Sequence, residues 1–198
     1  MAQQAAADEA DRLQHLEDII RTDTDLMQVL TTASRSNLPQ WRLGGGCVYQ
    51  RVWNALTGRP GRTGVKDYDL VYFNAADLSW ESEDKVARSI TAALPDFHGV
   101  VEVRNHARVP LWFEQRFGFH CPAVAHPDDV FRQYPLTVQA LGVRLEPDGF
   151  LNILAPFGLA DLFALRIRPN RSLPNKTSYE EKTRRLIETW PELTVEPW

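Results

Sequence analysis

Cysteine is scarce in this sequence, and long apolar segments are missing. Cys47 and Cys121 are the only cysteines, which is too few for a disulfide framework. No apolar run approaches the roughly 18 residues of a membrane-spanning helix, and the first residues do not have the pattern of a signal peptide. These absences argue against a disulfide-rich secreted scaffold and against a membrane-spanning protein. We therefore expect a protein of the reducing cytoplasm with no membrane partner.

An excess of positive charge is also missing. The 198 residues include 22 lysines and arginines against 26 aspartates and glutamates, which gives a formal net charge of -4. A protein that binds nucleic acid mainly by neutralising phosphates needs a broad basic surface, so we do not expect an extensive nucleic-acid surface. A hydrophobic content of 43% with 24% charged residues is typical of a folded globular protein, and the length suits one domain.

The stretch from Trp41 to Phe73 contains the main functional signal. The glycine run Gly44-Gly45-Gly46 follows a short strand pattern, and Asp67 and Asp69 precede the apolar run Leu70-Val71-Tyr72-Phe73. Carboxylates two residues apart on a strand point the same way and can share a cation. Glycines ahead of an amphipathic helix supply backbone N–H groups and a helix N-terminus, which suit a phosphate, although a plain tight turn also explains them. Together these features indicate a site for metal-bound phosphates.

Glu102 is the only acid in the predicted strand Gly99–Val103. An acid among apolar strand residues is costly unless it is paired or bound to a metal, which favours Glu102 as a third metal ligand. The alternative is an edge strand on which Glu102 faces water or pairs with Arg104 or Lys66. Arg104 also belongs to a polar group at a strand end, where ligands commonly bind in sheet-based folds.

The order of these features resembles a known family. Gly-Gly, a helix, Asp-x-Asp on a strand and a third acid on a later strand are similar to the nucleotidyltransferase superfamily of DNA polymerase beta and the aminoglycoside nucleotidyltransferases. From about Leu38 to Trp190 the chain resembles, more narrowly, a bacterial nucleotidyltransferase-like family of unknown substrate, through KDYDLVYF, VEVRNHARVPLWF, APFGLADLF and RPN. The 20 residues between Gly46 and Asp67 are more than the superfamily pattern has, so we expect an insertion at residues 57–64.

The resemblance implies an α+β fold, with a mixed nucleotidyltransferase-type sheet, helices packed on it and further helices at both ends. It implies that Asp67, Asp69 and Glu102 are the catalytic and metal-binding residues, and that they hold two divalent ions, Mg²⁺ or Mn²⁺. One ion would orient the triphosphate of an NTP, and the other would activate an acceptor hydroxyl for attack on the α-phosphorus, with release of pyrophosphate. Glu102 is alternatively a general base. The expected nucleotide-binding residues are Gly44, Gly45, Gly46, Lys66 and Arg104.

Three functions remain open at the level of the sequence. The first is a metal-dependent nucleotidyltransferase that acts on an unidentified hydroxyl acceptor, either a small molecule or a macromolecule; the lack of a basic surface favours a small molecule or a protein. The second is a nucleotide-binding or regulatory module without activity, against which the three acids argue. The third is a toxin-like enzyme that nucleotidylates transfer RNA or a protein, whose toxicity on expression would be relieved by Asp67→Ala.

The resemblance, together with periodicity and turn signals, predicts three segments of one compact unit. These are N-terminal helices in residues 1–37, a nucleotidyltransferase core in 38–155 and a C-terminal helical segment in 156–198. The predicted elements are a disordered Met1–Ala7, helices at Asp8–Arg21, after Asp23, after the glycines, at Glu81–Leu94, His126–Phe131, Pro156–Arg168 and Ser178–Thr189, and strands at Trp41–Leu43, Gly99–Val103, Thr137–Leu145 and Phe150–Leu154.

Several polar and aromatic features have two interpretations each. Aromatic residues in Val109–Phe119 predict core packing or a stacking surface for a nucleobase, with core packing favoured. Asp161 is interpreted as a solvated or capping acid. His120, Cys121 and His126 do not have a convincing zinc spacing. The basic cluster of Arg166, Arg168, Arg171 and Lys176 either faces the active cleft or lies in a solvent-exposed turn.

Overall fold

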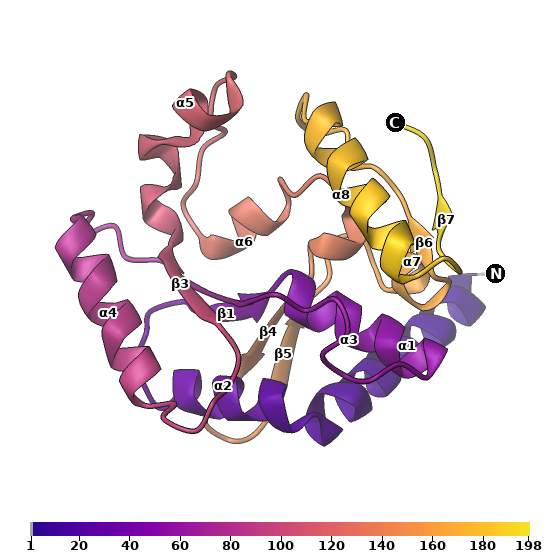
Figure 1. Cartoon of the computed structure of the whole chain (residues 1–198), viewed down its shortest axis with the longest axis horizontal. Coiled ribbons are helices and arrows are strands. Elements are labelled where there is room, and N and C mark those ends of the chain that lie inside the picture. The colour runs from indigo at the N-terminus through magenta and orange to yellow at the C-terminus, as the bar shows by residue number, and fades with distance from the viewer. Residues whose placement is uncertain (1) are drawn as a thin grey trace.

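A computed structural model describes residues 2–198 of the chain as a mixed sheet with helices on both faces (Figure 1). The α-helices are α1 (Ala2–Thr22), α2 (Thr24–Ser34), α3 (Gly46–Thr57), α4 (Trp80–Ala92), α5 (Phe113–Phe117), α6 (Pro127–Phe131), α7 (Ala160–Phe163) and α8 (Lys176–Thr189). Two 3-10 helices are η1 (His106–Leu111) and η2 (Thr137–Gln139). The strands are β1 (Arg42–Gly44), β2 (Tyr68–Tyr72), β3 (Val101–Asn105), β4 (Gly142–Leu145), β5 (Leu151–Leu154), β6 (Arg166–Ile167) and β7 (Thr194–Val195).

The main sheet has the strand order β3-β2-β1-β4-β5. β2 and β3 are parallel, whereas β1 pairs antiparallel with both β2 and β4, and β4 with β5. The strands predicted at Thr137–Leu145 and Phe150–Leu154 contain β4 and β5, which pair as a hairpin, since Glu146 N–H donates to the Phe150 carbonyl at 2.8 Å across the turn. A second, small sheet joins β6 and β7 in parallel. The α+β fold with a mixed sheet that the sequence predicts is confirmed.

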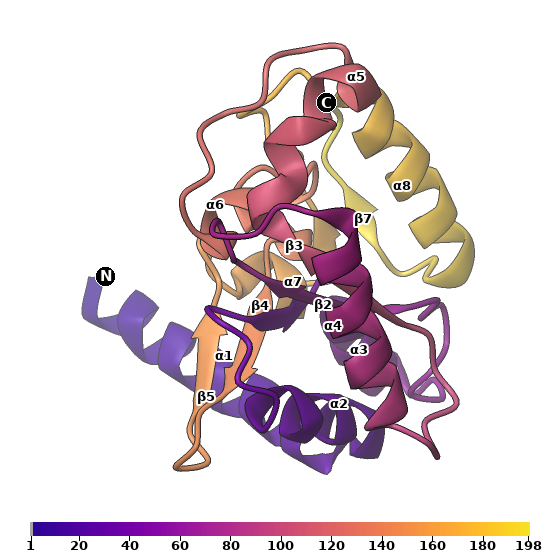
Figure 2. The ribbon, with the colours of Figure 1, turned by 90° about the vertical axis from the view of Figure 1, so that its left-hand side faces the viewer.

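One face of the main sheet is covered by the first three helices. Leu43, Leu70 and Val143 lie in register on neighbouring strands, and all three are fully or almost fully buried in the core with α1, α2 and α3. Figure 2 shows α1 and α2 together beneath the sheet, with α5 and α8 beyond its opposite face. The residues between the core positions, including Asp69 on β2, therefore point toward α5 and α8.

Local signals define the ends of α2 and α3, and ion pairs join the two helices. Asp23 caps α2 as predicted, because its carboxylate accepts from Leu26 N–H at 2.9 Å. α3 ends at Gly58, whose left-handed φ of 66° a glycine adopts without steric cost. The buried Arg51 of α3 pairs with Asp23 and Asp25, at 2.9 Å and 2.6 Å, and ties the two helices together. The glycines, α3, the loop and the acid-bearing strand follow one another in the predicted order, and the ion pairs of Arg51 fix α3 against α2.

The prediction of disorder at Met1–Ala7 is wrong for Ala2 to Ala7, where α1 has already begun; Met1 lies outside the described residues. The segment is rich in alanine, which has the highest helix propensity, and it continues into the predicted amphipathic helix. Glu9 of α1 accepts a hydrogen bond from Leu159 N–H at 2.7 Å, which fixes the helix against the C-terminal part of the chain.

The predicted helix at Pro156–Arg168 is wrong over most of its length. Only α7 is helical, and Leu165, two residues after its end, has a φ of 51°, which a continuing helix does not allow. Arg166 and Ile167 then pair with Thr194 and Val195. Hydrophobic periodicity cannot reveal that these residues pair with a distant strand, because it reports only on local structure.

Two further predictions are corrected at element boundaries. The predicted strand Thr137–Leu145 is a strand only from Gly142, because Thr137 N–H donates to the distant Arg168 carbonyl at 3.1 Å and the intervening residues form η2. The helix predicted at Ser178–Thr189 is corrected at its start. α8 begins two residues earlier, at Lys176, so Ser178 lies inside the helix. Within residues 2–198, none of the helices has the length and apolar character of a transmembrane span.

Candidate active site

Asp67 and Asp69 lie on one side of β2, as their spacing predicts. Asp69 belongs to the strand and is in register with Gly44 of β1 and Glu102 of β3, while Asp67 directly precedes the strand. Both carboxylates border a small polar cavity of about 180 Å³. Tyr68, between them, points the other way and is 2% exposed. The alternation of the strand thus presents two acids to one cavity.

The small cavity is enclosed by α3, the loop before β2 and α8. Gly46 and Gln50 come from the first turns of α3, Lys66 comes from the loop, and Lys182 and Arg185 come from α8. Its remaining lining residues are Tyr49, Gly64, Asp67, Asp69 and Gln139. Three cations and the N-terminus of a twelve-residue helix therefore face two carboxylates across a narrow space.

The three predicted glycines have three different roles. Gly44 is buried, and a Cβ there would lie 2.7 Å from the Leu141 carbonyl oxygen, so this position packs the sheet against its neighbour. Gly45 has φ 70° and ψ -139°, a conformation that is nearly restricted to glycine, and its N–H donates to the same Leu141 carbonyl at 3.2 Å. Of the three, Gly46 alone borders the cavity. The first N–H groups of α3 have no acceptor within the helix and remain for a ligand.

Asp69 is the most perturbed acid of the site. Burial raises its pKa to about 7, helped by the charges of Asp67 and Glu102, while Lys182 and Arg104 oppose the shift. Desolvation and like charges both disfavour the carboxylate form. A cation bound beside Asp69 would remove this penalty, so the acids fit a divalent ion by the chemistry of their oxygens.

Glu102 lies beside Asp69 in the sheet but outside both cavities that meet there. Its side chain is 42% exposed, and it accepts from Arg104 at 3.4 Å. This pairing is one of the two arrangements considered for Glu102 from the sequence. Across residues 2–198, no three His, Cys, Asp or Glu side chains converge as a group that could hold a metal ion. Asp69 and Glu102 are paired in register, and Asp67 lies two residues before Asp69. The three carboxylates do not meet at one point.

A second, larger cavity of about 610 Å³ begins at Asp69 and extends away from the glycines. Asp69, Gln139 and Lys182 border both cavities. Arg104 lines the large cavity, so the two predicted cations of the site lie in different cavities, Lys66 in the small one and Arg104 in the large one.

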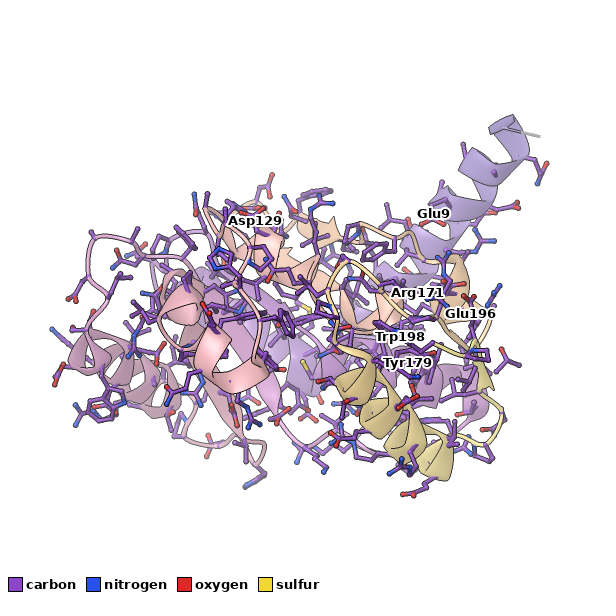
Figure 3. The ribbon with its side chains drawn as sticks, turned by 90° about the horizontal axis from the view of Figure 1, so that it is seen from above. Glu9, Asp129, Arg171, Tyr179, Glu196 and Trp198 are labelled. Atoms are coloured by element: carbon purple, nitrogen blue, oxygen red, sulfur yellow. The ribbon has the colours of Figure 1, made fainter. Side chains whose placement is uncertain are left out.

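Lys182 and Arg185 are site residues that the sequence did not indicate. The predicted basic cluster is instead occupied by ion pairs away from the cavities: Arg166 and Arg171 with Glu196, Arg168 with Asp161, and Lys176 with Glu180. In Figure 3, Arg171 and Glu196 lie together with Tyr179 and Trp198, on the C-terminal side of the molecule. The three-residue spacing of Lys182 and Arg185 on a helix was a usable signal, but it does not tell which face of the helix turns inward.

Comparisons with known proteins agree with this architecture. A family profile described as nucleotidyltransferase matches residues 31–195. An NMR structure described as a CCA-adding enzyme head domain has a TM-score of 0.75 at 22% identity, and the match covers 93% of this chain and 96% of that one. An apo CCA-adding enzyme and a CCA-adding enzyme with CTP have TM-scores of 0.52 and 0.51 at 18% and 16% identity.

These two matches cover 86% and 91% of this chain but only 39% and 42% of the enzymes, so the chain spans less than half of their length. At such identities the likeness shows the fold alone. A search of curated proteins finds no match.

Proposed function

The chain belongs to the nucleotidyltransferase family, and from this premise we propose that it transfers a nucleoside monophosphate from an NTP to a hydroxyl acceptor and releases pyrophosphate. The observation that carries the proposal is the position of Asp69, which borders both a small polar cavity and a larger cavity with several aromatic side chains in its walls. A transferase needs such a junction, because the bond that forms and the bond that breaks lie on opposite sides of one phosphorus atom.

The small cavity supplies what a triphosphate requires. Lys66, Lys182 and Arg185 border it, and the N-terminus of α3 begins there at Gly46. Ammonium and guanidinium groups neutralise phosphate oxygens, and free N–H groups at a helix start donate to them. A volume of about 180 Å³ suits phosphates rather than a whole nucleotide, so the nucleoside must extend beyond this cavity. One enzyme of this fold is described with CTP, which makes CTP the first donor to test.

The acids fit Mg²⁺ by their chemistry. Asp67 and Asp69 would hold it, with Glu102 as a further ligand, and a bound Mg²⁺ supplies polarisation of the phosphate oxygens and neutralisation of their charge. Glu102, partly exposed beside Asp69, is otherwise a general base that takes the proton of the acceptor hydroxyl. The acceptor oxygen bonds to the α-phosphorus, and the bond to the bridging oxygen breaks as pyrophosphate leaves with the electron pair.

Transfer of label from an NTP tests the proposed reaction. We would incubate the protein and Mg²⁺ with a small-molecule extract, using NTPs labelled at either the α- or the γ-phosphate. The proposal predicts a labelled product from α-labelled NTP only, and none with Asp67→Asn. A product labelled from the γ-phosphate would indicate a phosphotransferase instead. Labelled RNA or protein from a whole extract would support the macromolecular, toxin-like alternative.

A nucleotide-binding module without activity is the second candidate, favoured by one observation. Glu102 turns toward Arg104 and does not join Asp67 and Asp69 at the small cavity. This module would bind an NTP with Mg²⁺ but give no labelled product in any extract, and Glu102→Gln would leave its affinity for the NTP unchanged.

A further inference from the structure

The large cavity lies between two walls that come from distant parts of the sequence. One wall consists of η1, α5 and the start of α4, and the opposite wall is α8 with the segment before it. Figure 1 shows α5 and α8 rising on either side of α6, which lies between them against the sheet. Asp69 and Val71 of β2 form part of the floor. The cavity therefore opens on the face of the sheet that carries the acids.

The geometry of transfer decides which reactant occupies this cavity. The proposed triphosphate site ends at the helix start of Gly46, on one side of Asp69, and pyrophosphate leaves toward that side. The attacking and leaving oxygens lie roughly in line through the α-phosphorus. The acceptor hydroxyl must then approach from the opposite side of Asp69, which is the large cavity.

The walls of the large cavity are mainly apolar and aromatic. Phe113 packs against Phe117 and Phe119, with ring centroids 4.7 Å and 5.4 Å apart. The ring centroids of Trp112 and Phe117 are 6.2 Å apart. Both residues line the cavity, and they are 45% and 41% exposed. Rings that face a cavity while remaining open to solvent offer stacking surfaces. Phe113 belongs to a small apolar cluster that is separate from the main core.

Half of the residues that line the cavity are polar or charged, although most of its exposed surface is apolar, and some of these polar groups are paired with each other. Arg108 donates to Glu83 at 2.6 Å, and Glu83 also accepts from Asn105 N–H at 2.7 Å, so the charge of Arg108 is neutralised. Asn175 is 9% exposed, and within residues 2–198 no group donates to its Oδ1. Ligand sites of this size commonly combine apolar walls with a few placed polar groups. A nucleic-acid strand would instead require a continuous basic track.

We propose that the large cavity is the acceptor site, and that the acceptor is a small molecule with a flat apolar body and a hydroxyl group. The body stacks on the exposed aromatic surface that Trp112 and Phe117 form together, and the hydroxyl reaches the α-phosphorus beside Asp69. The inference rests on the proposed transferase function, because it uses the direction in which pyrophosphate leaves.

Binding of defined probes to single variants tests the acceptor site. 2-Naphthol and 4-methylumbelliferone have flat apolar bodies with one hydroxyl, glucose has hydroxyls without such a body, and a short single-stranded RNA represents a nucleic acid. Titration calorimetry should show binding of the first two and not of glucose. Trp112→Ala and Phe117→Ala should weaken that binding by about tenfold, as expected when one aromatic wall is removed, with the affinity for Mg²⁺ and CTP unchanged.

Leu111→Ala is the matched control, since Leu111 lies on η1 next to Trp112, is 62% exposed and does not line the cavity. It should leave the affinity of every probe unchanged. Equal loss of CTP binding in Trp112→Ala and Phe117→Ala would overturn the inference and identify the cavity as a nucleobase site. Binding of RNA but not of the aromatic alcohols would overturn it in favour of a nucleic acid. If the wild type binds no NTP while the alcohols bind, the proposed function fails and the apolar site stands.

Discussion

At the scale of single residues, the sequence indicated Asp67, Asp69 and Gly46 as residues of the small cavity, whereas it did not indicate the cations of α8. Asp67 and Asp69 are two residues apart on a strand, and the alternation of a strand alone places them on one side. Lys182 and Arg185 reach the same cavity from a helix more than 100 residues later. Tertiary packing decides which face of that helix points to the cavity, and a local sequence pattern does not contain this information.

Asp69 makes the stability of the metal-free protein depend on pH. The pKa of Asp69 is about 7 in the folded protein against 3.8 for an unperturbed aspartate, so between these pH values the folded state keeps a proton that the unfolded state has lost. Stability therefore falls as pH rises from about 4 to 7. Asp69→Asn removes this loss and should raise the free energy of unfolding at pH 8, without metal, by at least about 1 kcal/mol.

Urea unfolding with EDTA at pH 4 and pH 8 measures the effect of Asp69→Asn. The difference between variant and wild type should be near zero at pH 4 and should grow with pH. A variant that is less stable than the wild type at pH 8 would contradict the assigned burial of an unpaired charge.

Lys182 should contribute to triphosphate binding. Its side chain borders both cavities, and burial lowers its pKa while Asp69 and Asp67 oppose that shift. Lys182→Ala should weaken the affinity for an NTP with Mg²⁺ by about tenfold or more, the range for a hydrogen bond to a charged group. Lys176→Ala is the control on the same helix, because Lys176 pairs with Glu180 outside the cavities. Calorimetry that shows equal losses for the two variants would indicate a nonspecific charge effect.

At the scale of elements, the sequence predicted those whose signals are local. α2 follows an Asp cap, α3 follows the glycines, and the hairpin of β4 and β5 has its turn at residues 146–149. It did not predict β6 and β7, because each is two residues long and its partner lies 28 residues away. The sequence prediction also extended α7 past Leu165. This residue has a positive φ without being a glycine, and its carbonyl accepts from the distant Thr194 N–H, so no local signal marks the end of the helix.

The turn between β1 and α3 should be intolerant of a side chain at Gly45. A Cβ there would stand 2.9 Å from Asp69 Oδ2, and the backbone conformation is itself restricted to glycine. Gly45→Ala should cost about 1–3 kcal/mol of stability and should also weaken binding of an NTP with Mg²⁺, because the carboxylate must move. Thermal unfolding and calorimetry on the same sample measure the two effects.

Gly58→Ala is the matched control for Gly45→Ala. Gly58 also has a positive φ, and nothing lies within 4 Å of its added Cβ. It should lower stability without changing nucleotide affinity. A Gly45→Ala protein with wild-type affinity would show that the turn does not position Asp69.

At the scale of the whole molecule, we propose that residues 1–37, 38–155 and 156–198 unfold together. Trp190 at the end of α8 is 1% exposed, packs edge-to-face against Trp53 with ring centroids 5.4 Å apart, and donates to Asn54 Oδ1 at 3.0 Å. At the other end of the chain, Arg51 joins α3 to α2 through two ion pairs. These contacts connect the terminal segments to the central helix of the core.

Unfolding by heat should therefore be a single transition, with the same midpoint by far-ultraviolet circular dichroism and by tryptophan fluorescence. Trp190→Phe keeps the ring packing but loses the hydrogen bond to Asn54, and should lower stability by about 1 kcal/mol while preserving the single transition. Two separate midpoints in the wild type would show that the C-terminal segment is an independent unit.

The most direct test of the central claim is calorimetric titration of the protein with each of the four ribonucleoside triphosphates, with and without Mg²⁺. The same titrations are made on the Asp67→Asn, Asp69→Asn double variant, whose folding is verified by its thermal unfolding. The account predicts that at least one NTP binds the wild type only when Mg²⁺ is present, and that this binding is lost in the folded double variant. Binding that is equally tight in the double variant, or independent of Mg²⁺, would contradict a metal and triphosphate site at Asp67 and Asp69.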